Sequence, residues 1–193
     1  FFWQELLPVA YADAHDLPLV AARDSLRAMI AAEAGTLNWY RLDFWSERLK
    51  LDILALKASC AERVNYLPGA LAFIKAARAQ GFRLVLVTNS SRELLQIKDA
   101  RTQITAHMDA VYSSGDFAAA KESQQFWHRF SEAEQLRRED AVLLDDSASV
   151  LRAAQDFGLG GVLGLRKPDS RRAAGSFEDI DSVETVAALL PAD

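Results

Sequence analysis

Two adjacent carboxylates, Asp145 and Asp146, come directly after the short apolar run Val142–Leu144. An apolar run that ends in turn-forming residues is typical of a buried strand in a parallel sheet, and open α/β sheets bind their ligands at the carboxyl ends of their strands. Neighbouring carboxylates resist ionising together unless a cation or hydrogen bonds offset the repulsion. By itself the stretch has two interpretations: a metal site, or an N-cap supplied by Asp146 or Ser147 for a helix that begins near Ala148.

Thr88-Asn89-Ser90 forms a second polar group. It comes directly after Arg83–Val87, a mostly apolar run that contains the β-branched residues Val85 and Val87. That run has the composition of a strand. Taken alone, the polar group could be a turn that caps the following helix. Its hydroxyl and the backbone amides after it could also hydrogen-bond the oxygens of a phosphoryl group.

Lys121 is the third candidate, and it follows a shorter predicted strand, Asp109–Ser113. An isolated lysine is most often solvated. Because the carboxyl ends of parallel strands meet at one edge of a sheet, however, we expect Lys121 beside the polar groups at 88–90 and 145–146. A hydroxyl, an ammonium and a carboxylate pair at one edge suit a phosphoryl group beside a hard cation such as Mg²⁺.

The second half of the chain alternates helices with short apolar strands. Beyond the strands already named, a strand is predicted at Gly161–Leu165, and helices are predicted from Leu71 to Gly81, from Arg92 onward, over Glu122–Gln135 and over Ala148–Phe157. This alternation predicts an α/β fold with a Rossmann-like parallel sheet that is covered on both faces. The stretch from Ile180 to Leu190 fits either a strand or a helix.

Residues 1–67 show helical spacing of apolar residues and contain no strand candidate. Leu17-Pro18 interrupts the first helix, because the residue before a proline is pushed out of the α region. Helices are then predicted over Val20–Ala34 and Asp52–Arg63. The predicted organisation is therefore an all-helical domain, residues 1–67, followed by an α/β domain, residues 68–193.

Composition narrows the possible functions. A chain of 193 residues that is 50% hydrophobic and 25% charged is an ordinary globular protein. Its net charge of -5 argues against nucleic acid or an anionic membrane as the main partner. No apolar run is long enough to cross a bilayer, and the first residues do not resemble a signal peptide. The single cysteine, Cys60, excludes an intrachain disulfide and fits a reducing, cytoplasmic location.

The series Thr88-Asn89, Lys121 and Asp145-Asp146 resembles the second, third and fourth motifs of the haloacid dehalogenase (HAD) superfamily. The helical domain resembles the cap that subfamily I inserts after the first strand of its core. Within that subfamily, several strings of this chain are similar to the GMP/IMP nucleotidases: Phe2-Trp-Gln-Glu-Leu-Leu-Pro8, Thr36-Leu-Asn-Trp-Tyr40, Leu42-Asp-Phe-Trp-Ser46 and Leu144-Asp-Asp-Ser147.

The resemblance implies Mg²⁺-dependent hydrolysis of a phosphate monoester, with a purine mononucleotide as the expected substrate. In the family, an aspartate on the first core strand attacks phosphorus and a second aspartate acts as general acid and base. The reaction is thereby divided into two easier steps through an aspartyl-phosphate. By position, Asp146 would ligate Mg²⁺ directly, and Asp145 would do so directly or through water. Thr88 and Asn89 would hold the phosphoryl group, and Lys121 would bridge it to the carboxylates.

The family's first motif, an Asp-x-Asp followed by Gly, does not occur in this chain. The nearest string, Asp179-Ile-Asp181, follows no predicted strand and is expected to be loop. We therefore expect the first core strand, with its nucleophile, to precede Phe1, and residues 1–193 alone to be inactive. Ala120-Lys121-Glu122 also lacks the proline that often follows the motif lysine.

Trp39, Tyr40 and Trp45 are the candidate substrate contacts of the cap, because aromatic rings could stack on a purine. Packing between the cap helices is the alternative for each of them. A cap that covers the leaving group would exclude water and decide specificity.

Three rival functions stay open. The protein could be a phosphatase for another small phosphorylated metabolite, or a 2-haloacid dehalogenase that needs no metal. If the chain truly begins at Phe1, it could also be an inactive protein that binds a phosphorylated ligand. The Asp145-Asp146 pair favours a phosphatase over a dehalogenase.

Overall fold

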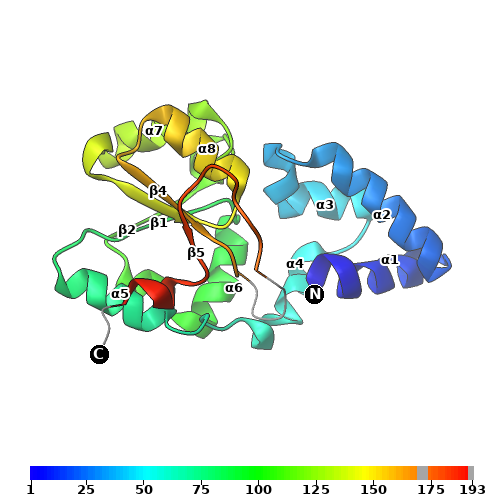
Figure 1. Cartoon of the computed structure of the whole chain (residues 1–193). Helices are drawn as coiled ribbons and strands as arrows, with labels where there is room; N and C mark the ends of the chain where they lie inside the picture. The colour runs from blue at the N-terminus through cyan, green and yellow to red at the C-terminus, as the bar shows by residue number, and fades with distance from the viewer. Residues whose placement is uncertain (169–173, 191–193) are drawn as a thin grey trace.

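The computed structural model describes residues 1–168 and 174–190. A group of helices formed by the first part of the chain lies beside an α/β part formed by the rest (Figure 1). This is the predicted fold class, a Rossmann-like α/β core with a helical cap. The first strand begins at Val85, and the division of the chain at residue 67 stays a prediction.

The cap contains helices and, within its described residues, no strand, as the spacing of apolar residues predicts. A left-handed Asp16 (φ 51°) ends the first α-helix, and Pro18 stands just before the second. The elements are η1 (Phe2–Leu6, π-helical), α1 (Leu7–His15), α2 (Leu19–Glu33), η2 (Leu37–Tyr40), α3 (Leu42–Leu49), α4 (Ile53–Ala58) and η3 (Ala61–Arg63).

The helix predicted over Asp52–Arg63 is shorter than expected. Asp52 begins α4 as a cap, since its carboxylate accepts a hydrogen bond from the amide of Ala55 at 2.8 Å. At the other end, Ser59 Oγ donates to the carbonyl of Leu56 at 2.9 Å. Side chains of this kind compete with backbone amides for the carbonyls of the last turn. The helix therefore stops at Ala58, and only the 3₁₀ turn η3 follows.

The cap has its own apolar core. Trp45, Leu49 and Ile53 are completely buried in it, together with Leu7 and Leu26. Complete burial of an aliphatic side chain stabilises a fold by about 1.5–3 kcal/mol, so these side chains can hold the short helices together. Leu94, on the first helix after β1, packs against the same cluster and joins the cap to the core.

The core consists of parallel strands between helices. In Figure 1, α7 and α8 lie on one face of the strands and α5 and α6 on the other. The helices are α5 (Ala70–Ala79), α6 (Arg92–Thr102), α7 (Gln124–Glu134) and α8 (Ala148–Phe157), and the strands are β1 (Val85–Thr88), β2 (Ala110–Ser113), β3 (Val142–Asp145), β4 (Gly161–Leu165) and β5 (Ser182–Val183). Short 3₁₀ turns complete the described part: η4 (Ile104–His107), η5 (Ser114–Phe117), η6 (Arg138–Asp140) and η7 (Val186–Leu189).

The described strands form two hydrogen-bonded groups rather than one sheet. β1 pairs with β2, and β3 pairs with β4, which pairs with β5. Every pairing is parallel, and the register places Thr88 beside Ser113 and Asp145 beside Gly164. Among the described residues, no strand pairs β1 with β3.

Helices α7 and α8 pack on one face of both groups of strands. Phe126, Trp127 and Phe130 of α7 are buried there with Val150 and Phe157 of α8. Side chains from β1, β3 and β4 contact this cluster, so one apolar layer spans the break in the sheet. No helix of the described residues is both long enough and apolar enough to cross a membrane.

Candidate functional site

A buried ion pair lies at the carboxyl edge of the strands. Lys121 and Asp145 are 7% and 8% exposed, and Lys121 Nζ lies 2.5 Å from Asp145 Oδ2. The same ammonium donates to the carbonyl of Val87 at 3.3 Å. An ammonium has three hydrogens, so one remains for a ligand. Lys121 is thus not a solvated surface residue, and it spans the break between β1 and β3.

Asn89 connects the end of β1 to the loop that carries Lys121. It is buried, and its Oδ1 accepts a hydrogen bond from the backbone amide of Lys121 at 3.0 Å. The neighbouring Thr88 Oγ1 accepts from the amide of Ser90 at 3.0 Å and still has its own hydrogen to donate. The N-cap of α6 is Ser91, which accepts from the amide of Leu94. Thr88 and Asn89 are therefore not the cap of that helix.

The N-cap interpretation of the acidic stretch is correct for the position of Ser147 but not for its side chain. Ser147 occupies the N-cap position of α8, but its side chain makes no capping hydrogen bond. Instead Asp145 Oδ1 accepts from the amide of Ser147 at 2.9 Å. Asp146 is exposed. Partial desolvation of its carboxyl, followed by repulsion from Asp145, raises the pKa of Asp146.

The two carboxylates offer part of a metal site. Asp145 and Asp146 supply hard oxygen ligands, and Mg²⁺ commonly binds one or two carboxylates together with waters and a substrate phosphate. Among the described residues, no group of three or more His, Cys, Asp or Glu side chains could hold a metal ion. The donor set therefore fits Mg²⁺ in kind but is incomplete within the described part of the chain.

The structure separates the three aromatic candidates of the cap. Trp45 is completely buried, and its indole N–H donates to the carbonyl of Trp39 at 3.0 Å. The ring of Trp39 stacks on Trp3 with centroids 4.9 Å apart. Trp45 is thus a packing residue, and its proposed contact with a purine is wrong for this arrangement of the cap. Tyr40 is different, because its hydroxyl donates to Glu122 of the core at 2.5 Å.

The packing role of Trp45 gives a stability prediction. Replacing Trp45 by alanine should lower the free energy of unfolding by about 3–5 kcal/mol, the usual cost of deleting a large buried aromatic side chain. Chemical denaturation measures the change. The same truncation at the half-buried Trp39 should cost clearly less, and equal losses at both positions would contradict the assignment.

A cavity of about 270 Å³ lies between the cap and the core, next to these residues. Tyr40 and Arg41 line it from the cap, and Asn89, Ser91 and the loop after β2 line it from the core. Its position beside Asn89 makes it the candidate space for the part of a substrate beyond the phosphoryl group.

Sequence reasoning missed two polar residues of this region. Lys98 Nζ donates to Ser90 Oγ at 2.9 Å. Burial lowers the pKa of Lys98, although the nearby Asp146 acts in the opposite direction. Ser91, Leu94 and Lys98 recur with helical spacing, and that spacing could have identified the lysine. Glu122 stands out in the sequence only because it occupies a position where the family often has a proline. Its hydrogen bond with Tyr40 joins residues that are 82 positions apart in the sequence.

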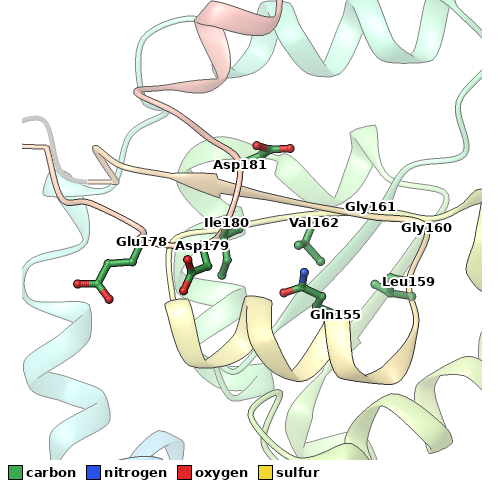
Figure 2. A pocket seen from close by; sticks show the side chains of 9 residues that line it. All are labelled: Gln155, Leu159, Gly160, Gly161, Val162, Glu178, Asp179, Ile180 and Asp181. Carbon is green, nitrogen blue, oxygen red and sulfur yellow. The ribbon is translucent and has the colours of Figure 1, made fainter.

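A second cavity, of about 500 Å³, lies between β4, α8 and the loop before β5. It is lined by the start of β4 at Gly161-Val162, by Gln155 of α8 and by the loop that contains Asp179 and Asp181 (Figure 2). Asp179-Ile-Asp181 is loop, as expected. Because it precedes β5 instead of following the carboxyl end of a strand, this string does not match the missing Asp-x-Asp motif.

The described residues form a parallel α/β core with a helical cap and a lysine–carboxylate pair at the strand ends, which is the arrangement expected of a HAD-like protein. The chain belongs to the haloacid dehalogenase-like hydrolase family, whose sequence model matches residues 7–158. It is 34% identical to the GMP/IMP nucleotidase YrfG of Escherichia coli K12 over 191 residues, which cover 99% of this chain and 86% of that protein.

Solved structures show the same fold at lower sequence identity. A HAD phosphatase from Thermococcus onnurineus superposes with a TM-score of 0.78 at 19% identity, over 95% of this chain and 86% of that one. The L-2-haloacid dehalogenase PA0810 superposes with a TM-score of 0.64 at 16% identity, over 97% and 91% of the two chains. Since a phosphatase and a dehalogenase share this fold, the reaction has to be argued from the site.

Proposed function

We propose that the protein is a Mg²⁺-dependent phosphate-monoester hydrolase, and that its substrate is a purine 5′-nucleotide such as GMP or IMP. One observation carries the phosphatase assignment: Lys121 is ion-paired with Asp145, and a second carboxylate, Asp146, follows at once. A site for a phosphoryl group and a divalent cation needs positive charge and hard oxygen ligands together. The similarity to a GMP/IMP nucleotidase supports the choice of a purine nucleotide.

In this proposal, the residues of β1 and of the loop before α7 bind and orient the phosphoryl group. The hydroxyl of Thr88 and the remaining N–H of Lys121 donate to its oxygens. Asn89 holds the amide of Lys121 and thereby fixes the loop. Fixed donors of this kind need no reorganisation as charge develops on the oxygens, which lowers the barrier.

Mg²⁺ would be held by Asp146, with Asp145 as a second or water-mediated ligand. The ion would supply charge compensation for the phosphoryl oxygens and polarise the phosphorus centre. Lys121 already balances the charge of Asp145, so Asp146 is the carboxylate whose negative charge remains for the cation. Burial and repulsion from Asp145 raise the pKa of Asp146, and a bound cation would oppose both effects.

The nucleophile belongs to the same proposal and lies upstream of residue 1. Its carboxylate would attack phosphorus, and the second aspartate of the motif would protonate the departing alcohol and later activate water. The test compares residues 1–193 with the chain extended by its upstream coding sequence. We expect Mg²⁺-dependent phosphate release only from the extended chain; equal turnover by residues 1–193 would place the nucleophile within them.

Substrate preference provides a separate prediction. In a phosphate-release panel with the extended chain and Mg²⁺, GMP and IMP should have values of kcat/KM roughly tenfold or more above those of sugar phosphates, since differential pocket contacts give discrimination of about 10–200-fold. A strong preference for a sugar phosphate would contradict the assignment of a purine substrate but not the assignment as a phosphatase.

The same panel separates the rival functions. Halide release from a 2-haloacid without added metal would identify a dehalogenase. Tight binding of phosphate by the extended chain without turnover of any monoester would identify a binding protein. Phosphate release that EDTA abolishes and Mg²⁺ restores would support the proposed reaction.

A further inference from the structure

A chain of three hydrogen bonds runs from the cap to the loop that carries Lys121. The Tyr40 hydroxyl donates to Glu122 Oε1 at 2.5 Å, and Asn89 Nδ2 donates to Glu122 Oε2 at 3.0 Å. The other end of the Asn89 amide, Oδ1, accepts from the backbone N–H of Lys121 at 3.0 Å. These three hydrogen bonds therefore connect η2 of the cap, the end of β1 and the residue that pairs with Asp145.

The groups at the two ends of this series determine which atom donates and which accepts in every hydrogen bond. The backbone N–H of Lys121 can only donate, so the amide oxygen of Asn89 must face it and the amide NH₂ must face Glu122. A carboxylate accepts at both oxygens and so satisfies Asn89 and Tyr40 together. Burial, followed by the hydrogen bond to Glu122, raises the pKa of Tyr40, so its hydroxyl keeps the proton that it donates.

Glu122 also stands where the family often has a proline. A proline at this position could accept neither hydrogen bond, because it has no side-chain oxygen. The carboxylate thus adds a connection between cap and core that depends on this residue. Tyr40 and Asn89 both line the 270 Å³ cavity between the two parts, so the connection forms where a leaving group would lie.

We propose that Tyr40, Glu122 and Asn89 form a latch that couples the position of the cap to the orientation of Lys121. When the cap is seated, Tyr40 fixes Glu122, Glu122 fixes the Asn89 amide, and Asn89 holds the loop of Lys121 in place. When the cap moves away, Glu122 loses one partner and Asn89 is less restrained. The three are positioning residues of the phosphoryl site, and the inference rests on the function proposed above.

Tyr40→Phe tests the latch, because it removes the hydroxyl and keeps the ring. Inorganic phosphate is the probe, because it has no leaving group for the cap to contact, and its affinity is measured by calorimetry on the extended chain with Mg²⁺. Loss of a hydrogen bond to a charged group corresponds to roughly ten- to a hundredfold in an equilibrium constant. Because the effect is indirect, we expect phosphate affinity to fall by about tenfold, near the lower limit.

Tyr112→Phe is the matched control. The hydroxyl of Tyr112 donates to Glu134 at 2.7 Å, the same pairing within the core and without a contact to the cap. This variant should bind phosphate like the wild type. Glu122→Ala should match Tyr40→Phe or exceed it. Glu122→Gln should lose less, because its NH₂ group can donate to the Tyr40 oxygen while its carbonyl still accepts from Asn89.

Three outcomes are distinguishable. Weaker phosphate binding in Tyr40→Phe, but not in Tyr112→Phe, supports the latch. Unchanged binding in Tyr40→Phe, with normal binding by the wild type, means that Tyr40 only packs the cap and overturns the latch while the phosphatase assignment stands. A wild-type chain that binds no phosphate overturns the proposed function and the latch with it.

Discussion

Replacing Lys121 by methionine should reduce phosphate release by at least a hundredfold and also destabilise the fold. The ammonium is the positive charge placed for the phosphoryl oxygens, and removing one such electrostatic contact costs about a hundred- to a thousandfold in kcat. The same change leaves Asp145 buried without its partner. Breaking a buried ion pair from one side typically costs about 3–5 kcal/mol. Steady-state kinetics and chemical denaturation measure the two losses.

A double variant separates the two effects. In Lys121→Met with Asp145→Leu, no unpaired charge remains, and apolar replacement of both partners of a buried pair is often neutral or stabilising. Stability should therefore recover while activity stays lost. Lys75→Met, at an exposed position of α5, should change neither. Recovery of activity in the double variant would show that Lys121 acts only on stability.

Much of this site could be predicted because each of its parts is local in sequence. Thr88, Lys121 and Asp145 each follow an apolar strand, and a parallel sheet brings the ends of its strands to one edge. The end of α8 was also predictable: Gly158 ends the helix in a left-handed conformation, as its lack of a Cβ predicts. Fold class and candidate site residues therefore follow from periodicity and turn chemistry.

The roles of individual cap residues could not be predicted, because they depend on packing between distant segments. Trp45 and Tyr40 are both aromatic and lie in adjacent elements, yet one is completely buried and the other reaches the core. Nothing in their local sequence separates them. The pairing of Tyr40 with Glu122 depends on where the cap rests on the core. Similarly, the sequence does not show which of the two adjacent aspartates pairs with Lys121, and the structure shows that it is Asp145.

That difference between the two aspartates leads to the second large effect. Asp146→Asn should reduce Mg²⁺-dependent phosphate release by roughly a hundredfold or more, because it removes the charge proposed to hold the ion. Stability should stay within about 0.5 kcal/mol of the wild type, as for most exposed positions. A raised pKa means that folding disfavours the ionised form of Asp146, so removing its charge cannot cost a stabilising interaction. Phosphate release across a Mg²⁺ titration, together with thermal unfolding, measures both quantities.

Asp145→Asn should behave differently, although it is the same chemical change one residue earlier. It leaves Lys121 without a counter-charge in a buried place, so both stability and activity should fall. Asp156→Asn, on the exposed side of α8, controls for the loss of a carboxylate as such and should alter neither. If Asp146→Asn released phosphate at the wild-type rate and with the same Mg²⁺ dependence, Asp146 could not be the ligand. Asp145, freed from Lys121 by a bound cation, would then be the carboxylate to examine.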